Sequence, residues 1–329
     1  MRVSSSIPPA SLALAPAASP APSTVRLART PEERAAVFRL RYDVYVAEQG
    51  KPYAGANHER RELADELDAH SDLLVVLRGE TVAGTLRRTF SDAWDFRRLP
   101  RECALDRFPL RAGHVVGYSS RFVVAPAHRH SFVSAALLVE AYGQSGERGI
   151  VLDLLTASPA LVPLYERVGY RRYTAGGIVT AEAGLLVPKV LTPTDHAFLR
   201  SIRSPFARAA HRFAADAGWS AWLLETFPRV GAYYAHGVEE TTTALAAATG
   251  LCFDAAARVL RLGFVHHFAG VAPGRLDARH TCAFIALDDD AVFCLGLDAL
   301  AGLETREADV AARLRAAATP MPNASASAA

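Results

Sequence analysis

The chain has 329 residues, half of them hydrophobic, and a formal net charge of +2. That length allows two modest domains with a sizeable core, and so small a charge argues against bulk attraction to nucleic acid or a membrane surface. The four cysteines are scattered without a CxxC pair, so we expect neither a metal site nor disulfides, and a reducing, cytoplasmic location.

Both ends of the chain have the composition of disordered segments. Residues 1–23 are rich in Ala, Pro and Ser, and residues 316–329 have a similar composition. Such segments cannot bury enough surface to offset the entropy lost on ordering, so we predict disorder in both. No run approaches the roughly 18 apolar residues of a membrane span, so no transmembrane segment is expected.

The first ordered elements are predicted to be a strand at 24–28 and a helix from Thr30 to about Gln49. Thr30 is a good N-cap, Pro31 suits the first helical position, and two acids follow in the first turn. Residues 50–71 are polar and predicted to be a loop. Residues 73–77 and 81–90 form a predicted hairpin around Arg78-Gly79-Glu80.

The next segments alternate between strand and helix patterns. We predict a strand at 114–124, a helix at 131–147, a strand at 149–156, a helix capped by Ser158 and two strands within 170–187. This order indicates a mixed sheet flanked by helices, an α/β domain spanning 24–192. Pro188 to Pro193 has the composition of a boundary. Residues 193–315 are predicted to be a mainly helical domain of unknown role, with helices at 195–224, 239–262 and 298–318 and a hairpin between 281 and 295.

A basic turn joins the predicted strand and helix on either side of residue 127. Phe122-Val123-Val124-Ala125-Pro126 is followed by Ala127-His128-Arg129-His130-Ser131 and then by a helical pattern. Free backbone N–H groups and the positive end of the helix dipole meet at such a turn, where a phosphate can bind. The predicted donor-binding residues are Val123, Val124, Arg129, His130 and Ser131.

The segment Leu164-Tyr165-Glu166-Arg167-Val168-Gly169-Tyr170 resembles the last conserved element of the GCN5-related N-acyltransferases (GNAT). The resemblance implies that Tyr165 faces the thioester sulfur and protonates the leaving thiolate. The turn at 127–132 is poorer in glycine than the family's phosphate loop. This difference favours an acyl carrier protein over coenzyme A as the donor.

Further polar residues resemble two branches of this fold, the acyl-homoserine lactone synthases and the N-acyl amino acid synthases. Arg41 and Tyr45 match an Arg-x-x-x-aromatic pair, and Asp65 and Asp68 match two spaced aspartates. Arg87 matches the arginine of a G-x-x-R strand. Ser120 and Arg121 match an S/T-R-F strand. The resemblance covers roughly residues 25–190 and implies acyl transfer to an amine, with acyl carrier protein or coenzyme A as co-substrate and no tightly bound cofactor.

Two departures bear on the acceptor. The lactone synthases have a Trp where this chain has Gly50-Lys51-Pro52, and a Glu where it has Tyr118. Both argue against S-adenosylmethionine and for an amino acid or similar small amine. Asp65, Asp68 and Glu48 would then hold the acceptor ammonium and assist its deprotonation, and Arg87 or Arg121 would bind its carboxylate. Backbone N–H groups at Val123 and Val124 would stabilise the oxyanion.

Other interpretations remain open. The acidic residues could be a solvated charge run, Arg41 a surface residue, and the Arg and Asp residues a structural salt bridge. At the level of function, the alternatives are an acyl-homoserine lactone synthase and a non-catalytic regulatory protein that binds acyl carriers.

Overall fold

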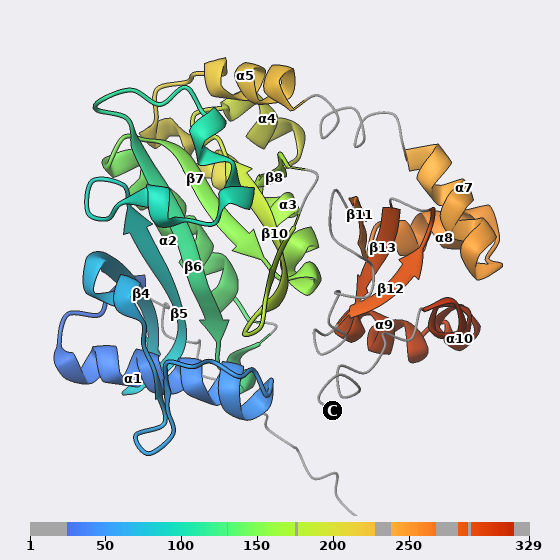
Figure 1. Ribbon diagram of the computed structural model, residues 1–329, viewed down its shortest axis with the longest axis horizontal. Coiled ribbons are helices and arrows are strands. Elements are labelled where there is room, and N and C mark those ends of the chain that lie inside the picture. Colours follow the sequence, from blue (N-terminus) through green and yellow to red (C-terminus); the bar gives the residue numbers. More distant parts are fainter. Residues whose placement is uncertain are drawn as a thin grey trace, which may run out of the picture.

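The computed structural model describes residues 25–129, 131–174, 177–227, 238–267, 282–288 and 291–318. Figure 1 shows a large twisted sheet with helices packed on it, and a smaller sheet of C-terminal residues beside it. The expected fold class is confirmed: a mixed α/β part is followed by a helix-rich C-terminal part. The predictions for residues 1–23 and for most of 316–329 lie outside the described residues.

The main sheet has eight strands within the described residues, in the order β1-β4-β5-β6-β7-β10-β8 with β9 paired to β10. Its neighbours are antiparallel except β6 and β7, which are parallel because α2 crosses over between them. The strands are β1 (Val25–Leu27), β4 (Ser71–Arg78), β5 (Thr81–Phe90), β6 (Val115–Val124), β7 (Ile150–Ala157), β8 (Arg171–Arg172), β9 (Ile178–Thr180) and β10 (Gly184–Leu191).

Helices cover both faces of this sheet. On one face lie α1 (Pro31–Arg41) and its continuation as a π-helix, η1 (Tyr42–Glu48); on the other lie α2 (Val133–Glu147) and α3 (Val162–Val168). A capping box between Thr30 and Glu33 starts α1 as predicted. The side chains of β4 alternate, so that Leu73 and Val75 pack toward α1 while Leu74 and Val76 pack toward α2.

Short elements fill the connections, and some differ from the predictions. The predicted loop at 50–71 contains a two-stranded ribbon and a 3₁₀ turn, and Pro188 to Leu191, where a linker was expected, complete β10. Between 170 and 191 there are three strands instead of two. The short elements are β2 (Ala56–Asn57), β3 (Glu62–Leu63), η2 (Glu66–His70), η3 (Phe96–Arg98), η4 (Arg101–Cys103), η5 (Leu105–Arg107), η6 (Pro126–His128) and η7 (Pro159–Leu161).

The C-terminal helices are more broken than their composition indicated. Pro205 opens a 3₁₀ turn within the first predicted helix, and Gly250, with φ +65°, separates the two helices that replace the second. The strand β11 was not predicted; it joins the expected hairpin in a sheet of order β11-β13-β12. The elements are α4 (His196–Ser201), η8 (Pro205–Arg208), η9 (Ala210–Arg212), α5 (Gly218–Thr226), α7 (Val238–Thr249), α8 (Phe253–Leu260), β11 (Phe264–His267), β12 (Cys282–Ala286), β13 (Ala291–Gly296), α9 (Leu297–Glu304) and α10 (Ala308–Ala317).

The segment from α4 to α5 packs directly on the main sheet and its helices. Leu199 and Phe206 belong to the same buried cluster as Leu137, and the Phe206 ring stacks on Tyr142 with 4.5 Å between centroids. One face of the C-terminal sheet, including Phe284, joins that cluster too. The domain division at residue 192 stays a prediction.

None of the described helices is long and apolar enough to cross a membrane singly. The bent pair Glu239–Thr249 and Phe253–Leu260 meets the length and composition requirement only when taken together, across a bend of 111°.

Candidate active site

The candidate site lies where β6 and β7 stop pairing. Their parallel register ends at Ser119 and Leu155, although β6 continues to Val124 and β7 continues along β10 to Ala157. No described residue of β7 pairs with β6 beyond Ser119, which leaves backbone groups of residues 120–124 on one edge without a strand partner. Unpaired backbone groups of this kind are available to a ligand that enters between the strands.

A β-bulge shapes the same stretch of β6. Thr85 pairs with Val123 and Arg87 pairs with Ser120, so Leu86 alone faces both Arg121 and Phe122. Arg121 takes the left-handed conformation with φ +52° that the extra residue requires. Bulges turn a side chain away from its regular direction, and this one brings Arg121 to the same carboxylate as Arg87.

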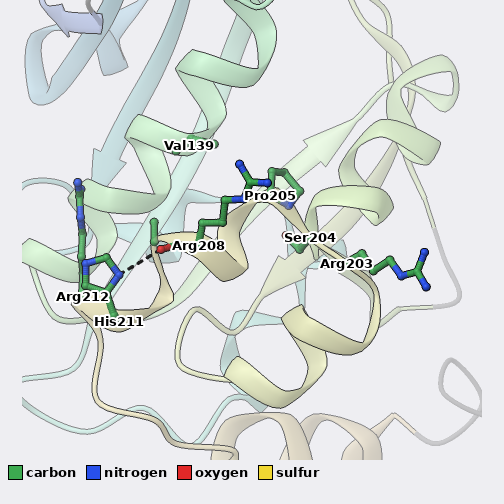
Figure 2. A pocket seen from close by; sticks show the side chains of 8 residues that line it. Val139, Arg203, Ser204, Pro205, Arg208, His211 and Arg212 are labelled. Carbon is green, nitrogen blue, oxygen red and sulfur yellow. Dashed lines mark hydrogen bonds between the residues drawn. The ribbon is translucent and has the colours of Figure 1, made fainter.

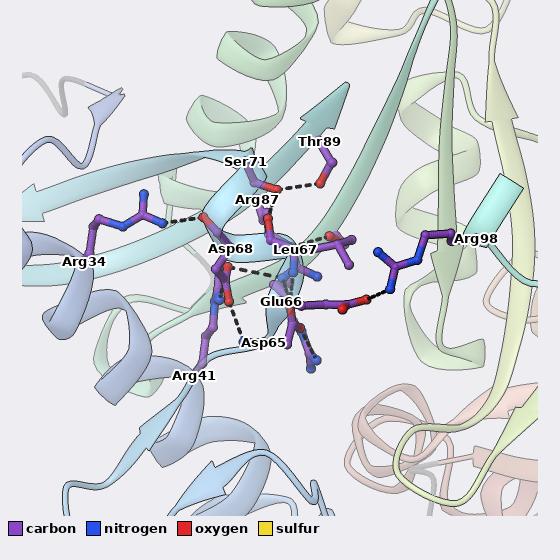
Figure 3. Close-up of polar contacts among 12 residues, drawn as sticks. Arg34, Arg41, Asp65, Glu66, Leu67, Asp68, Ser71, Arg87, Thr89 and Arg98 are labelled. Atoms are coloured by element: carbon purple, nitrogen blue, oxygen red, sulfur yellow. Dashed lines mark hydrogen bonds and ion pairs between the residues drawn. The ribbon is translucent and has the colours of Figure 1, made fainter. Parts of the chain in front are cut away.

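The inner part of an ion cluster joins α1, β5 and η2, as Figure 3 shows. Arg41 is fully buried and donates through Nη1 to Asp68 Oδ1 at 2.7 Å. Arg87, with a side chain only 4% exposed, has its Nη1 3.2 Å from the same oxygen. Because each buried charge has an opposite charge in contact, the cluster avoids the cost of an unpaired ion. Arg41 is therefore a core residue instead of a surface residue.

The outer part of the cluster centres on Asp65, whose side chain is 28% exposed. Asp65 accepts from Arg87 and from Arg121, the latter at 2.8 Å, and Arg87 Nε also donates to Ser120 Oγ at 2.9 Å. Burial disfavours the charged form of Asp65, but the two guanidiniums outweigh it and lower its pKa to about 2. Arg121, with a side chain 16% exposed, lies at the solvent side of the cluster.

The cluster has an excess of positive charge. Three guanidiniums, those of Arg41, Arg87 and Arg121, meet two carboxylates, those of Asp65 and Asp68, which leaves one net positive charge. The paired salt bridge anticipated from the sequence is present. A site with this balance attracts a carboxylate more readily than an ammonium ion, so its electrostatics favour the predicted role of the arginines over that of the aspartates.

Two tyrosines and a lysine border the solvent side of the cluster. The Arg121 guanidinium lies 4.6 Å from the ring centre of Tyr53 and 5.8 Å from that of Tyr45, and Lys51 Nζ lies 5.2 Å from the Tyr45 centre. The Tyr45 hydroxyl donates to the carbonyl oxygen of Phe122 at 3.3 Å, and burial raises its pKa to about 12. Tyr53 was not among the predicted residues, because nothing in a polar loop distinguishes it before the loop folds onto Arg121.

On the donor side, the backbone N–H groups of Val123 and Val124 point in opposite directions. Ala125 donates its N–H to Ala83 on β5, and N–H groups alternate in direction along a strand, so the N–H of Val124 faces the unpaired edge while that of Val123 faces β5. The side chain of Val123 is buried against Leu40 and Val44. Of the two predicted oxyanion donors, Val124 has the suitable direction.

The basic turn is held by contacts of its own. Arg129 makes two hydrogen bonds of 2.6 Å to the carboxylate of Glu48, at the end of η1. Ser131 Oγ donates to His128 O and accepts from Val133 N at 3.3 Å, where α2 begins. His130 lies outside the described residues. Glu48 is thus joined to the donor turn, and its described contacts do not include Asp65 or Asp68.

Tyr165 lies on α3, on the other side of the unpaired edge. It is buried, and its ring centre is 6.3 Å from that of Phe122 on β6. Burial raises the pKa of its hydroxyl, so the group stays protonated at neutral pH. No described residue hydrogen-bonds to that hydroxyl, which leaves it free to donate to a ligand.

A second buried ion cluster was missed by the sequence analysis. Arg88 and Asp153 form a salt bridge in which both side chains are buried. Arg88 also donates to Ser119 and Ser145, each at 2.7 Å, and Tyr170 donates to Asp153 at 2.8 Å. The only sequence signal is the second arginine of the GTLRR segment. Adjacent strand residues point to opposite faces, so one of the two arginines had to be buried on the α2 side.

Other features lie apart from this site. Among the described residues, no three or more His, Cys, Asp or Glu side chains are grouped so as to hold a metal ion. A cavity of about 600 Å³ lies between α2 and the η8–η9 segment, where Arg208, His211 and Arg212 line it (Figure 2). None of the predicted site residues lines that cavity.

Comparisons with known proteins give a family match for the part of the chain that carries most of this site. A family model of the acetyltransferase (GNAT) domain matches residues 40–139. The chain therefore contains a GNAT domain, as the sequence indicated; the match includes the predicted residues from Arg41 to Ser131 and ends before Tyr165. None of the curated proteins compared with the chain matches it.

The chain is also similar to several solved structures, among them TofI, BjaI and FeeM. TofI, solved in a ternary complex with an inhibitor and MTA, is 17% identical over 56% of this chain and 98% of its own, with a TM-score of 0.44. The CoA-dependent acyl-homoserine lactone synthase BjaI, with MTA, is 17% identical over 54% and 92%, with a TM-score of 0.42. FeeM, an N-acyl amino acid synthase from uncultured soil microbes, is 16% identical over 56% and 97%, with a TM-score of 0.40.

Proposed function

We propose that this protein transfers a fatty acyl group from a carrier thioester to the amine of an amino acid or a similar small amine. The observation that carries the proposal is the unpaired edge of β6 beyond Ser119. It has a free backbone N–H at Val124, a protonated Tyr165 across from it and a positively charged cluster beside it. The GNAT domain match over residues 40–139 supports the same reaction class.

The residues suit the successive steps of acyl transfer. A neutral amine attacks the thioester carbonyl, and the N–H of Val124 stabilises the oxyanion that forms. The C–S bond then breaks and the electron pair leaves with sulfur. Tyr165 donates its hydroxyl proton to that thiolate as the C–S bond breaks, because burial keeps the hydroxyl protonated until that step.

The acceptor is proposed to carry a carboxylate. Arg121 and Asp65 are the most accessible members of the ion cluster, and its net charge is positive. A guanidinium fork binds a carboxylate through two parallel hydrogen bonds. Arg121 therefore binds the acceptor carboxylate, supported by Arg87 and Ser120, while Asp65 keeps the fork oriented.

The donor is proposed to be an acyl carrier protein in preference to coenzyme A. Arg129 is engaged with Glu48 and the turn has no glycine, so few groups remain for a pyrophosphate, whereas the first N–H groups of α2 suffice for a single phosphate. Phe132, at the start of α2, is 84% exposed. An exposed aromatic side chain beside the donor turn is suited to contact with a protein partner.

Mass-spectrometric product detection tests the proposal. Purified protein would be incubated with an acyl carrier protein and with coenzyme A, each loaded with the same acyl chain, and with mixed amino acids or S-adenosylmethionine. An N-acyl amino acid is the expected product. An acyl-homoserine lactone would instead identify a lactone synthase, and carrier binding without any product would identify a regulatory protein. Equal catalytic efficiency with both donors at moderate salt would contradict the donor preference.

A further inference from the structure

Each of the carboxylates expected to deprotonate the acceptor is occupied by arginine. Asp65 contacts Arg87 and Arg121, Asp68 contacts Arg41 and Arg87, and Glu48 is held by both Nη atoms of Arg129. A carboxylate whose pKa is lowered to about 2, as in Asp65, is a weak base. The acceptor ammonium must still lose a proton before its nitrogen can attack, so the reaction needs a base from elsewhere in the site.

Lys51 is the titratable side chain that remains. It lies three residues after the end of η1, its backbone N–H donates to the carbonyl of Tyr45 at 3.0 Å, and its side chain is half-buried over the Tyr45 ring. No described carboxylate lies within ion-pair distance of its Nζ. Burial, with the nearby charge of Arg121, lowers its pKa to about 8. Partial burial without a described counter-ion favours the neutral form of a lysine, which is the form that acts as a base.

The position of Lys51 matches the position proposed for the acceptor. Lys51 and Arg121 both lie over the Tyr45 ring, and the Tyr53 ring packs against Tyr45 at a tilt, with 5.8 Å between the ring centres. Among the described residues, the charged and titratable groups facing Lys51 are Arg121, Tyr45 and Tyr53. Glu182 approaches only the neighbouring backbone, where it accepts from Ala54 N at 3.1 Å. An α-amino acid has one carbon between its carboxylate and its amine. A carboxylate on Arg121 therefore keeps the amine beside the Tyr45 ring, over which Lys51 also lies.

We propose that Lys51 is the general base that removes a proton from the acceptor ammonium, an inference that rests on the proposed acyl transfer. The neutral Lys51 amine takes one N–H proton and becomes an ammonium, and the acceptor nitrogen keeps the electron pair that attacks the thioester. As the tetrahedral intermediate collapses, Tyr165 gives its proton to the departing thiolate and regains one from the acceptor nitrogen, which loses its second proton in this step. The excess positive charge nearby assists, because it lowers the pKa of the acceptor ammonium as well.

Steady-state kinetics of Lys51→Arg and Lys51→Ala test this role. Arginine keeps the positive charge but cannot deprotonate at working pH, so kcat should fall by about 100-fold or more while KM for the acceptor changes little. In the wild type, kcat should rise with pH through the pKa of Lys51, and this limb should be absent from both variants. Small primary amines added to Lys51→Ala should restore part of kcat. Full activity of Lys51→Arg with an unchanged pH profile would overturn the proposal.

A second measurement does not depend on turnover. Lys51 and Lys189 are the only lysines in the sequence, so ¹³C-lysine labelling gives two NMR signals, and Lys51→Arg identifies one by its loss. A titration of the Lys51 signal near pH 8 is expected. A titration above pH 10 would overturn the base role even if the wild type is active. A Lys51 titration near pH 8 without any acylated product would instead reject the proposed function itself.

Discussion

Two adjacent arginines of β5 anchor two ion clusters that differ in charge balance and access. Arg88 is sealed between β5, β7 and α2, where one carboxylate and three hydroxyl groups complete its surroundings. Arg87 belongs to a cluster with three arginines and two aspartates, which runs from fully buried Arg41 to accessible Arg121 and Asp65. The sealed cluster around Arg88 has no net charge, and the open cluster around Arg87 has a net charge of one positive unit.

The difference indicates what each cluster is for. A buried, balanced pair specifies how strands and helices fit together, and it has no opening through which a ligand could enter. A cluster with graded exposure and an excess charge can exchange one internal partner for a substrate carboxylate. Burial of charge alone therefore does not identify a functional residue. An excess of charge in a cluster, together with members that solvent can reach, is the better indicator.

The largest effect is expected from breaking the sealed cluster. Arg88→Leu leaves the Asp153 carboxylate buried without its counter-ion, which should lower the free energy of unfolding by about 3–5 kcal/mol in urea denaturation. The double variant Arg88→Met with Asp153→Leu removes both charges and should recover most of that loss. If the single variant is as stable as the wild type, the cluster is not structural.

A loss of activity without unfolding is expected from the open cluster. Arg121→Ala removes the proposed carboxylate fork and should lower kcat/KM for the acceptor roughly 10- to 150-fold, corresponding to about 1.5–3 kcal/mol. Arg87→Ala should lower product formation as well, but with some loss of stability, because its side chain is only 4% exposed. Normal turnover in Arg121→Ala, with circular dichroism confirming the fold, would remove that residue from the site.

The pH dependence of the free energy of unfolding should report how much the ionised Asp65 carboxylate stabilises the fold. Its folded pKa of about 2 lies below the ordinary value of 3.8, so its ionised form stabilises the fold above pH 4, and that contribution is lost as pH falls toward 2. Asp65→Asn should cost roughly 2 kcal/mol at pH 7, and its difference from the wild type should shrink toward zero near pH 2. Urea titrations at several pH values measure both; a pH-independent difference would contradict the assignment.

The smallest expected effect is a difference in stability between two variants of Arg121, which distinguishes the role of its backbone conformation from that of its side chain. Because Arg121 has φ +52°, glycine suits its backbone better than alanine. Arg121→Gly should therefore be about 1 kcal/mol more stable than Arg121→Ala, while both lose activity to the same extent. Equal stability of the two variants would show that the bulge relaxes when the side chain is removed.

The sequence by itself was sufficient for the elements whose local signals agree. The N-cap at Thr30 predicted the start of α1, the turn at Gly79 predicted the β4–β5 hairpin, and the strand–turn–helix around residue 127 predicted the start of α2. Local chemistry decides these features, because each depends on residues a few positions apart. The same signals failed for β11 and for the broken C-terminal helices, where long-range packing and a few Gly and Pro residues decide.

For the candidate site, the sequence identified individual residues but not the contacts between them. Residues such as Arg41, Asp65 and Arg121 could be named from motif spacing, but their partners could not, since they are brought together by α1, η2 and the bulge in β6. Tertiary structure alone decided that Glu48 pairs with Arg129 and that Arg88 and Arg87 belong to two different ion clusters. It also decided that no described carboxylate pairs with Lys51. The physical reason is that ion pairing and burial depend on distances between segments far apart in the chain, and a linear pattern does not contain those distances.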